Sequence, residues 1–210
     1  MKKLIIVGAG GFARELADWI EDINDVKPTW DLLGFIDDNP DALSGIPCKY
    51  KVIGSIQDWN PLNDESFVCG LAIPKVKRKV IDSLKSRGAK FVTIVHPSAI
   101  ISDSAFLGEG VVVTPRSGIN ANSYVGDYVS VLESGIGHDA HVGSFSTLSG
   151  RVNVNGHVFI GEGVYVGCAA SIAPGKRVGD DASISIGSVV ISNVKSGRTV
   201  FGNPAKIVEI

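Results

Sequence analysis

The chain has 210 residues, of which 44% are hydrophobic and 20% charged, values typical of a globular protein with one large domain or two smaller ones. Its formal net charge of -2 lacks the basic excess of nucleic-acid-binding proteins, so we expect no nucleic acid as a partner. No apolar run reaches the roughly 18 residues of a membrane span, and Cys48, Cys69 and Cys168 form no disulfide framework or CxxC motif, so we expect a cytoplasmic protein outside the membrane.

The first half of the chain, residues 1–96, is expected to fold as a small Rossmann-like parallel α/β domain. Residues 4–7 form a short continuous apolar run, which is typical of a buried parallel strand and too short for a secretion signal. Residues 12–23 follow with apolar side chains at helical spacing. Strands and helices then alternate, which favours a parallel sheet. The remaining expected elements are strands at 32–36, 67–73 and 91–95 and a helix at 74–87.

After His96 and Pro97 the pattern changes to a period of six residues. Aliphatic side chains recur every six positions, with a single five-residue step between Val131 and Ile136. This period is typical of a parallel β-helix, in which each repeat buries its aliphatic residue against the stacked coils. Residues 97–210 are therefore expected to form a β-helix with a C-terminal tail. The sixteen repeat positions are Ile101, Leu107, Val113, Ile119, Val125, Val131, Ile136, Val142, Leu148, Val154, Ile160, Val166, Ile172, Val178, Ile184 and Val190.

Several repeats begin with an aliphatic residue and a glycine, as in Val125-Gly126-Asp127 and Ile160-Gly161-Glu162. This form resembles the hexapeptide-repeat acyltransferases, which implies a left-handed β-helix with three repeats per coil and a homotrimer. The whole chain is similar to one subgroup, the amino-sugar N-acetyltransferases and sialic acid O-acetyltransferases of bacterial glycan pathways. The segments that carry this similarity are residues 7–11, 34–38, 95–99, 137–139 and 201–206.

His138 and Asp139 fall at a predicted corner of the coil, because corners lie two and three residues after each aliphatic position. The resemblance implies that His138 is the general base, which takes a proton from an amine or hydroxyl as that group attacks a thioester. The ordinary pKa of a histidine, about 6.5, suits this role near neutral pH. Asp139 stands where the family usually has glutamate, and we expect it to orient the imidazole ring.

A second corner stacks Gly150, Cys168 and Ile186, which lie 18 residues apart. The resemblance implies that acetyl-CoA, the co-substrate, lies along this column and the C-terminal tail. In the family the histidine comes from one subunit and much of this groove from the next, so active sites between subunits are expected. Plain coil turns without a ligand also fit these small residues. The residues expected to bind acetyl-CoA are Thr147, Gly156, Cys168, Ile186, Pro204 and Lys206.

The loop of residues 8–13 has the form G-x-G-x-x-A between a strand and a helix, a form that lets a phosphate approach the helix N-terminus. The pair Asp37-Asp38 ends the second expected strand, where a ribose or base is commonly held. A tight turn without a ligand also explains the glycines. The resemblance implies a nucleotide-linked amino sugar, such as a 4-amino-dideoxy hexose. The residues expected to bind it are Gly8, Gly10, Gly11, Phe12, Asp37 and Asp38.

Three other functions stay open at this point. O-acetylation of a sialic acid uses the same base, and a nucleotide-binding trimeric scaffold without activity has the same fold. Some hexapeptide-repeat proteins are zinc carbonic anhydrases, in which case His138, His141 and His157 would be the ligands. Because His141 is expected on a flat face, away from the other two histidines, we expect no metal.

Overall fold

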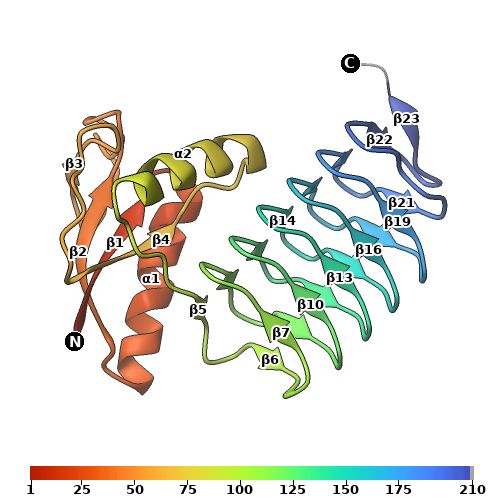
Figure 1. Cartoon of the computed structure of the whole chain (residues 1–210), viewed down its shortest axis with the longest axis horizontal. Helices are drawn as coiled ribbons and strands as arrows, with labels where there is room; N and C mark the ends of the chain where they lie inside the picture. The colour runs from red at the N-terminus through yellow and green to blue at the C-terminus, as the bar shows by residue number, and fades with distance from the viewer. Residues whose placement is uncertain (209–210) are drawn as a thin grey trace. The chain divides into compact units, whose positions relative to one another are not determined.

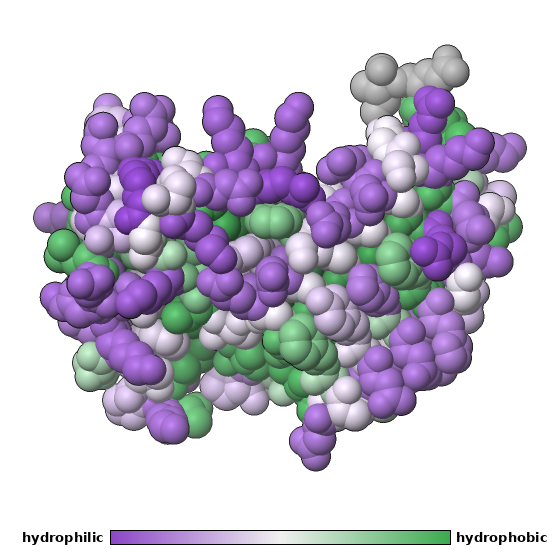
Figure 2. Space-filling view, viewed as in Figure 1, coloured by the Kyte–Doolittle hydropathy of each residue, from purple (hydrophilic) through white to green (hydrophobic). Residues whose placement is uncertain are grey.

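The computed structural model describes residues 1–208, and the chain divides into one unit of Met1–Pro97 and a second that begins at Ser98 (Figure 1). Within the described residues, no helix combines the length and the apolar character that crossing a membrane requires. Figure 2 shows polar side chains interleaved with small apolar areas over the visible face. This is the surface expected when the aliphatic side chains of both units point inward.

The first unit is a parallel α/β fold, as predicted. Its four-stranded sheet has the order β3-β2-β1-β4, and all three pairs of neighbours are parallel. Helix α1 buries Ala13, Leu16, Ala17 and Ile20, and α2 has Pro74 in its first turn, where a missing N–H costs nothing. The elements are β1 (Lys2–Val7), α1 (Gly11–Val26), β2 (Trp30–Ile36), β3 (Val52–Gly54), β4 (Glu65–Cys69), α2 (Pro74–Ser86) and β5 (Ile94–Val95).

Three details of this unit differ from the prediction. The short strand β3 was not predicted, because three residues are too few to show a pattern. The strand expected over 67–73 ends at Cys69. The next residue, Gly70, passes so close to α1 that a Cβ there would lie 2.6 Å from that of Ala13. The strand expected over 91–95 is reduced to β5 and to an isolated parallel bridge between Phe91 and Phe67.

The second unit is a parallel β-helix with three faces, in which the strands from β6 to β21 have two residues each and stack in coils (Figure 1). One face contains β6 (Ile100–Ile101), β9 (Gly118–Ile119), β12 (Gly135–Ile136), β15 (Asn153–Val154), β18 (Ser171–Ile172) and β21 (Val189–Val190). The next contains β7 (Phe106–Leu107), β10 (Tyr124–Val125), β13 (His141–Val142), β16 (Phe159–Ile160) and β19 (Arg177–Val178). The third contains β8 (Val112–Val113), β11 (Ser130–Val131), β14 (Thr147–Leu148), β17 (Tyr165–Val166), β20 (Ser183–Ile184), β22 (Thr199–Phe201) and β23 (Lys206–Val208). It ends in the three-residue strands β22 and β23, which pair with each other in antiparallel orientation.

Each of the sixteen predicted aliphatic positions is the second residue of a strand, from β6 to β21, and those from Val113 onward are buried. The interior also contains hydroxyl groups that bond to the neighbouring coil. Ser123 Oγ donates to the carbonyl of Gly137 at 2.9 Å, and Ser146 Oγ donates to that of Gly161 at 3.0 Å. Because these buried hydroxyls have acceptors, they join the coils without a desolvation penalty. The six-residue period thus predicted the strands from β6 to β21 correctly, whereas β22 and β23 lie beyond the repeat and were not predicted.

Candidate functional site

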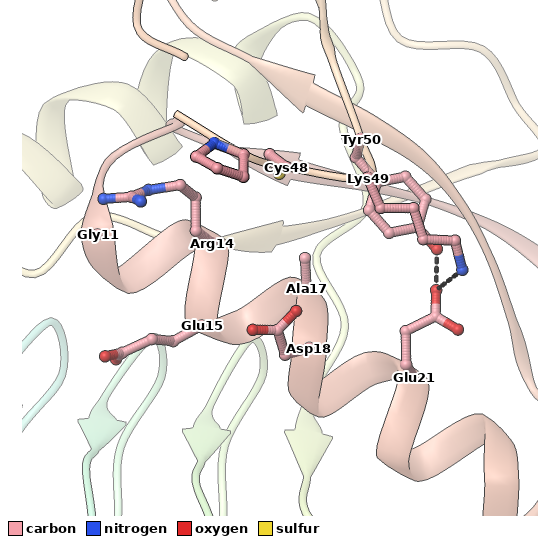
Figure 3. Close-up of a pocket in the computed structure, with 10 residues that line it drawn as sticks. Gly11, Arg14, Glu15, Ala17, Asp18, Glu21, Cys48, Lys49 and Tyr50 are labelled. Atoms are coloured by element: carbon pink, nitrogen blue, oxygen red, sulfur yellow. Dashed lines mark hydrogen bonds and ion pairs between the residues drawn. The ribbon is translucent and has the colours of Figure 1, made fainter. Parts of the chain in front are cut away.

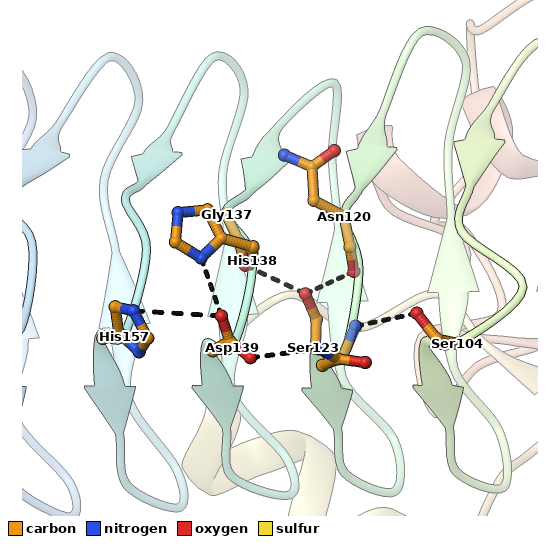
Figure 4. Close-up of polar contacts among 8 residues, drawn as sticks. Ser104, Asn120, Ser123, Gly137, His138, Asp139 and His157 are labelled. Carbon is orange, nitrogen blue, oxygen red and sulfur yellow. Dashed lines mark hydrogen bonds and ion pairs between the residues drawn. The ribbon is translucent and has the colours of Figure 1, made fainter.

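His138 and Asp139 form the corner between β12 and β13. Asp139 has a positive φ of 56°, a value that several second corner residues of this β-helix share. The two side chains turn toward each other, and His138 Nδ1 lies 2.7 Å from Asp139 Oδ2 (Figure 4). The His138 side chain is 60% exposed, and its other ring nitrogen, Nε2, has no hydrogen-bond partner within residues 1–208, which leaves it available to a substrate. The structure therefore brings together the predicted base and its predicted partner.

A residue of the preceding coil supports this pair. Asn122 Nδ2 donates to Asp139 Oδ1 at 3.2 Å, and the backbone N–H of Asn122 donates to Ser104 Oγ at 3.0 Å. The hydrogen bond from His138, and next the one from Asn122, hold the pKa of the Asp139 carboxyl below its ordinary value. Asp139 therefore stays ionised and accepts from the ring. Asn122 was not among the predicted site residues.

The His138 ring lies over Gly156, the corner residue of the following coil. A Cβ at residue 156 would be only 2.6 Å from His138 Nε2, so only glycine leaves room for the ring in this position. The Gly156 amide donates to no other group within residues 1–208 and so is available to a ligand. Both residues line an open groove of about 400 Å³, together with Asn120, Gly135, Ile136, Gly137, Asn153, Val154, Asn155, His157 and Pro174.

The other three histidines lie in different settings. His157 Nε2 is 3.8 Å from Asp139 Oδ2, and its ring meets that of His138 edge to face at 5.1 Å. His141 is stacked between Tyr124 and Phe159 on the outer face of β13, at 4.6 Å from each ring. Burial, and next the charge of Arg177, lowers the pKa of His141. His96 contacts Asp22 at 3.2 Å within the first unit.

The predicted acetyl-CoA residues lie in several places. Cys168 and Ile186 are exposed and stack with Gly150 at the corner between the β14 and β15 faces, where the Ala169 and Gly187 amides bond to the coil before them. Gly156 lies instead at the corner of His138, and the Thr147 side chain is fully buried. The cis peptide Asn203-Pro204 precedes β23. Lys206 lines a separate cavity of about 410 Å³ near Lys195 and Arg198.

The glycine-rich loop of the first unit lies between β1 and α1, as predicted, and Gly8 has a positive φ of 93°. Asp37 Oδ2 accepts from the Ala9 amide at 2.8 Å, so it fixes this loop. Asp38 Oδ1 accepts from Ser55 Oγ at 2.8 Å and from the Gln57 amide at 3.0 Å. Although burial opposes it, these bonds lower the pKa of Asp38. The acidic pair therefore already binds groups of its own chain.

A cavity of about 630 Å³ lies beside this loop, between α1 and residues 47–50 (Figure 3). Of the predicted substrate-binding residues, only Gly11 lines it. Arg14 Nε is buried there and has no hydrogen-bond partner among the residues that the structure describes, and Glu21 accepts from Tyr50 Oη and Lys49 Nζ. No sequence pattern pointed to these residues, because the cavity forms only when residues 47–50 fold back onto the helix.

Comparisons with known proteins agree with the fold. The family of the PglD N-terminal domain matches residues 3–84. GDP-perosamine N-acetyltransferase of Escherichia coli O157:H7 is 30% identical over 152 residues, which cover 70% of this chain and 69% of that one.

Two solved structures are similar over nearly the whole length. The acetyltransferase domain of PglB from Neisseria gonorrhoeae FA1090, in complex with acetyl coenzyme A, has a TM-score of 0.90 at 27% identity and covers 99% of each chain. PerB from Caulobacter crescentus, in complex with CoA and GDP-perosamine, has a TM-score of 0.88 at 25% identity and covers 100% of this chain and 98% of that one. The chain therefore belongs to the hexapeptide-repeat amino-sugar acetyltransferases and is an acyltransferase.

Proposed function

We propose that the chain transfers the acetyl group of acetyl-CoA to the amine of a nucleotide-linked amino sugar, such as a 4-amino-dideoxy hexose, in bacterial glycan biosynthesis. The observation that carries this proposal is the His138–Asp139 pair at an open groove. Nδ1 of His138 is hydrogen-bonded to the Asp139 carboxylate, which leaves Nε2 of the exposed ring for the substrate. The relatives support the same chemistry, since one is named as a GDP-perosamine N-acetyltransferase and another is solved with acetyl coenzyme A.

In the proposed mechanism, His138 acts as a general base. Asp139 accepts a hydrogen bond from Nδ1–H and so keeps the lone pair on Nε2. As the amine attacks the thioester carbonyl, Nε2 takes the amine proton and a tetrahedral oxyanion forms. The Gly156 amide, which has no acceptor within residues 1–208, donates to that oxyanion. The intermediate then expels the CoA thiolate, which takes the proton from the imidazolium, and no metal ion takes part.

Acetyl-CoA is proposed to lie along the exposed corner of Gly150, Cys168 and Ile186, and the C-terminal residues Pro204 and Lys206 would complete its site. This corner differs from the corner of His138, so one subunit would supply the base and the next much of the acetyl-CoA groove. We therefore also propose a homotrimer that acts in the cytoplasm. Light scattering of the purified protein tests the trimer directly, and a monomeric mass under assay conditions would contradict it.

The function is tested by following thiol release from acetyl-CoA with a panel of nucleotide-linked 4-amino sugars and free sialic acid. We expect turnover with an amino-sugar nucleotide and a loss of at least about 100-fold in His138→Ala, the scale of lost general-base catalysis. His141→Ala is the matched control, because His141 is stacked on an outer face away from the pair.

The other outcomes separate the competing functions. Turnover with sialic acid alone would change the activity to O-acetylation and keep the base. Full activity in His138→Ala would overturn its role as the base. No turnover, together with no thermal stabilisation by acetyl-CoA, would favour an inactive scaffold.

A further inference from the structure

Three potential metal ligands meet at the corner of His138. Nitrogen atoms of His138 and His157 and a carboxylate oxygen of Asp139 all lie within 4.8 Å of one another. Asp139 Oδ2 faces both rings, at 2.7 Å from His138 Nδ1 and 3.8 Å from His157 Nε2 (Figure 4). The two histidines lie on adjacent coils of the same corner, where the His157 amide donates to the His138 carbonyl at 3.0 Å.

This set of ligands has the chemistry of a zinc site. Two imidazoles and one carboxylate are a common three-ligand set for Zn²⁺, with water as the fourth ligand. Zinc–ligand distances of about 2.1 Å in a tetrahedron place the ligand atoms about 3.4 Å apart. The side chains of His138, Asp139 and His157 are 60%, 38% and 66% exposed, so small rotations bring them to this spacing. Asn122 bonds to the other Asp139 oxygen and so leaves Oδ2 for the metal.

The cluster differs from the set of three histidines that the sequence left open. His141 does not belong to it, since its ring is held between Tyr124 and Phe159 on the outer face of β13. Asp139 takes the third position instead. A carboxylate between two imidazoles also adds a negative charge, which favours the binding of a divalent cation.

We propose that His138, Asp139 and His157 bind a divalent zinc ion that inhibits acetyl transfer, so that zinc is an inhibitor of this enzyme rather than its cofactor. This inference rests on the proposed role of His138 as the base. When zinc binds Nδ1, the proton that Nδ1 carried moves through solvent to Nε2, because a neutral imidazole has a single N–H. Nε2 then has no lone pair to accept the proton of the amine, and Asp139 binds zinc instead of orienting the ring.

The first test is a calorimetric titration of the purified full chain with zinc chloride, in the absence of both substrates. His157→Gln removes one ligand and is expected to weaken zinc binding by at least about tenfold, the lower end of the effect of removing a supporting partner. His141→Gln is the matched control and is expected to bind zinc as the wild type does. Cys168→Ser tests the exposed thiol as an alternative ligand and is also expected to leave binding unchanged.

The second test measures inhibition by zinc relative to the rate of each variant without the metal. The concentration for half inhibition is expected to rise in His157→Gln by the same factor as the dissociation constant, and EDTA is expected to restore the wild-type rate. Zinc affinity that is equal in His157→Gln and His141→Gln would overturn the proposed site. Zinc that binds at the site without slowing transfer would overturn the inhibition. The metal-free assay of His138→Ala decides the proposed function separately.

Discussion

At two corners of the β-helix, a carboxylate lies between polar side chains of the preceding and the following coil. One of these two corners also has a histidine next to the carboxylate, and the other does not. At the histidine corner, Asp139 lies between Asn122 and His157 and bonds to His138. At the arginine corner, Glu133 lies 2.7 Å from Arg116 Nη2 and 3.8 Å from Arg151 Nε. The two carboxylates occupy equivalent positions in their coils, because each has one partner 17 residues before it and another 18 residues after it.

The difference comes from the number of residues that turn each corner. Four residues, 137–140, join β12 to β13, whereas three residues, 132–134, join β11 to β12 at the five-residue step. The longer corner has room for a base and its carboxylate side by side. The shorter corner has only Glu133, which two arginines neutralise. A coil of this fold therefore becomes a candidate catalytic site through its corner residues, while the strands around it stay the same.

The largest expected effect comes from the carboxylate itself. Asp139→Asn keeps the shape of the side chain but lets it donate toward His138, which favours the tautomer with the proton on Nε2. We expect the rate constant kcat to fall by about 100-fold, with little change in melting temperature. Glu133→Gln is the matched variant at the arginine corner and is expected to change kcat by less than about threefold, because its exposed ion pairs contribute little. Equal losses in the two variants would show that the corners do not differ in function.

A smaller effect is expected from Gly156, where an added methyl group displaces the His138 ring. Gly156→Ala places a Cβ 2.6 Å from Nε2, so the ring must rotate away from its position over the coil. We expect kcat to fall by about 30-fold, because displacing a catalytic group by about 1 Å costs up to about 100-fold. Steady-state kinetics with both substrates varied measures this loss.

Gly150 is the matched glycine, since a Cβ there meets no atom of residues 1–208 within 4 Å. If acetyl-CoA lies along this column, Gly150→Ala raises the KM for acetyl-CoA and leaves kcat within about threefold of the wild type. A fall in kcat in Gly150→Ala as large as that in Gly156→Ala would contradict the specific contact between Gly156 and His138.

The repeat unit could be predicted from its sequence because it obeys a local rule, in which the second residue of each strand from β6 to β21 is aliphatic. The same rule predicted the corner at which His138 and Asp139 lie. It did not predict Asn122 as a partner of Asp139, because counting 18 residues back from Asp139 gives Ala121. The five-residue step between Val131 and Ile136 shifts the register by one and brings Asn122 beneath Asp139.

Other parts depend on contacts that no local pattern contains. The steric role of Gly156 appears only once the His138 ring is placed over it. In the first unit, the cavity at Arg14 depends on how residues 47–50 fold back onto α1, and Asp37 turns to the Ala9 amide of its own loop. Tertiary contacts of this kind decide which predicted residues are free to meet a ligand.

The smallest effect is expected when a carboxylate loses its contact with the side chain of the preceding coil. Asn122→Ala removes the 3.2 Å hydrogen bond to Asp139 Oδ1, so the carboxylate is held less firmly against His138. We expect kcat to fall by about fivefold, the rate equivalent of a hydrogen bond of about 1 kcal/mol.

Arg116→Ala removes the corresponding partner of Glu133 and is expected to leave kcat unchanged, because Glu133 has no histidine to orient. A double variant with Asp139→Asn distinguishes the cause: if Asn122 acts through the carboxylate, Asn122→Ala slows the wild type but adds less than twofold to the loss in Asp139→Asn. Full additivity would instead mean that Asn122 acts on the substrate or on the coil as a whole.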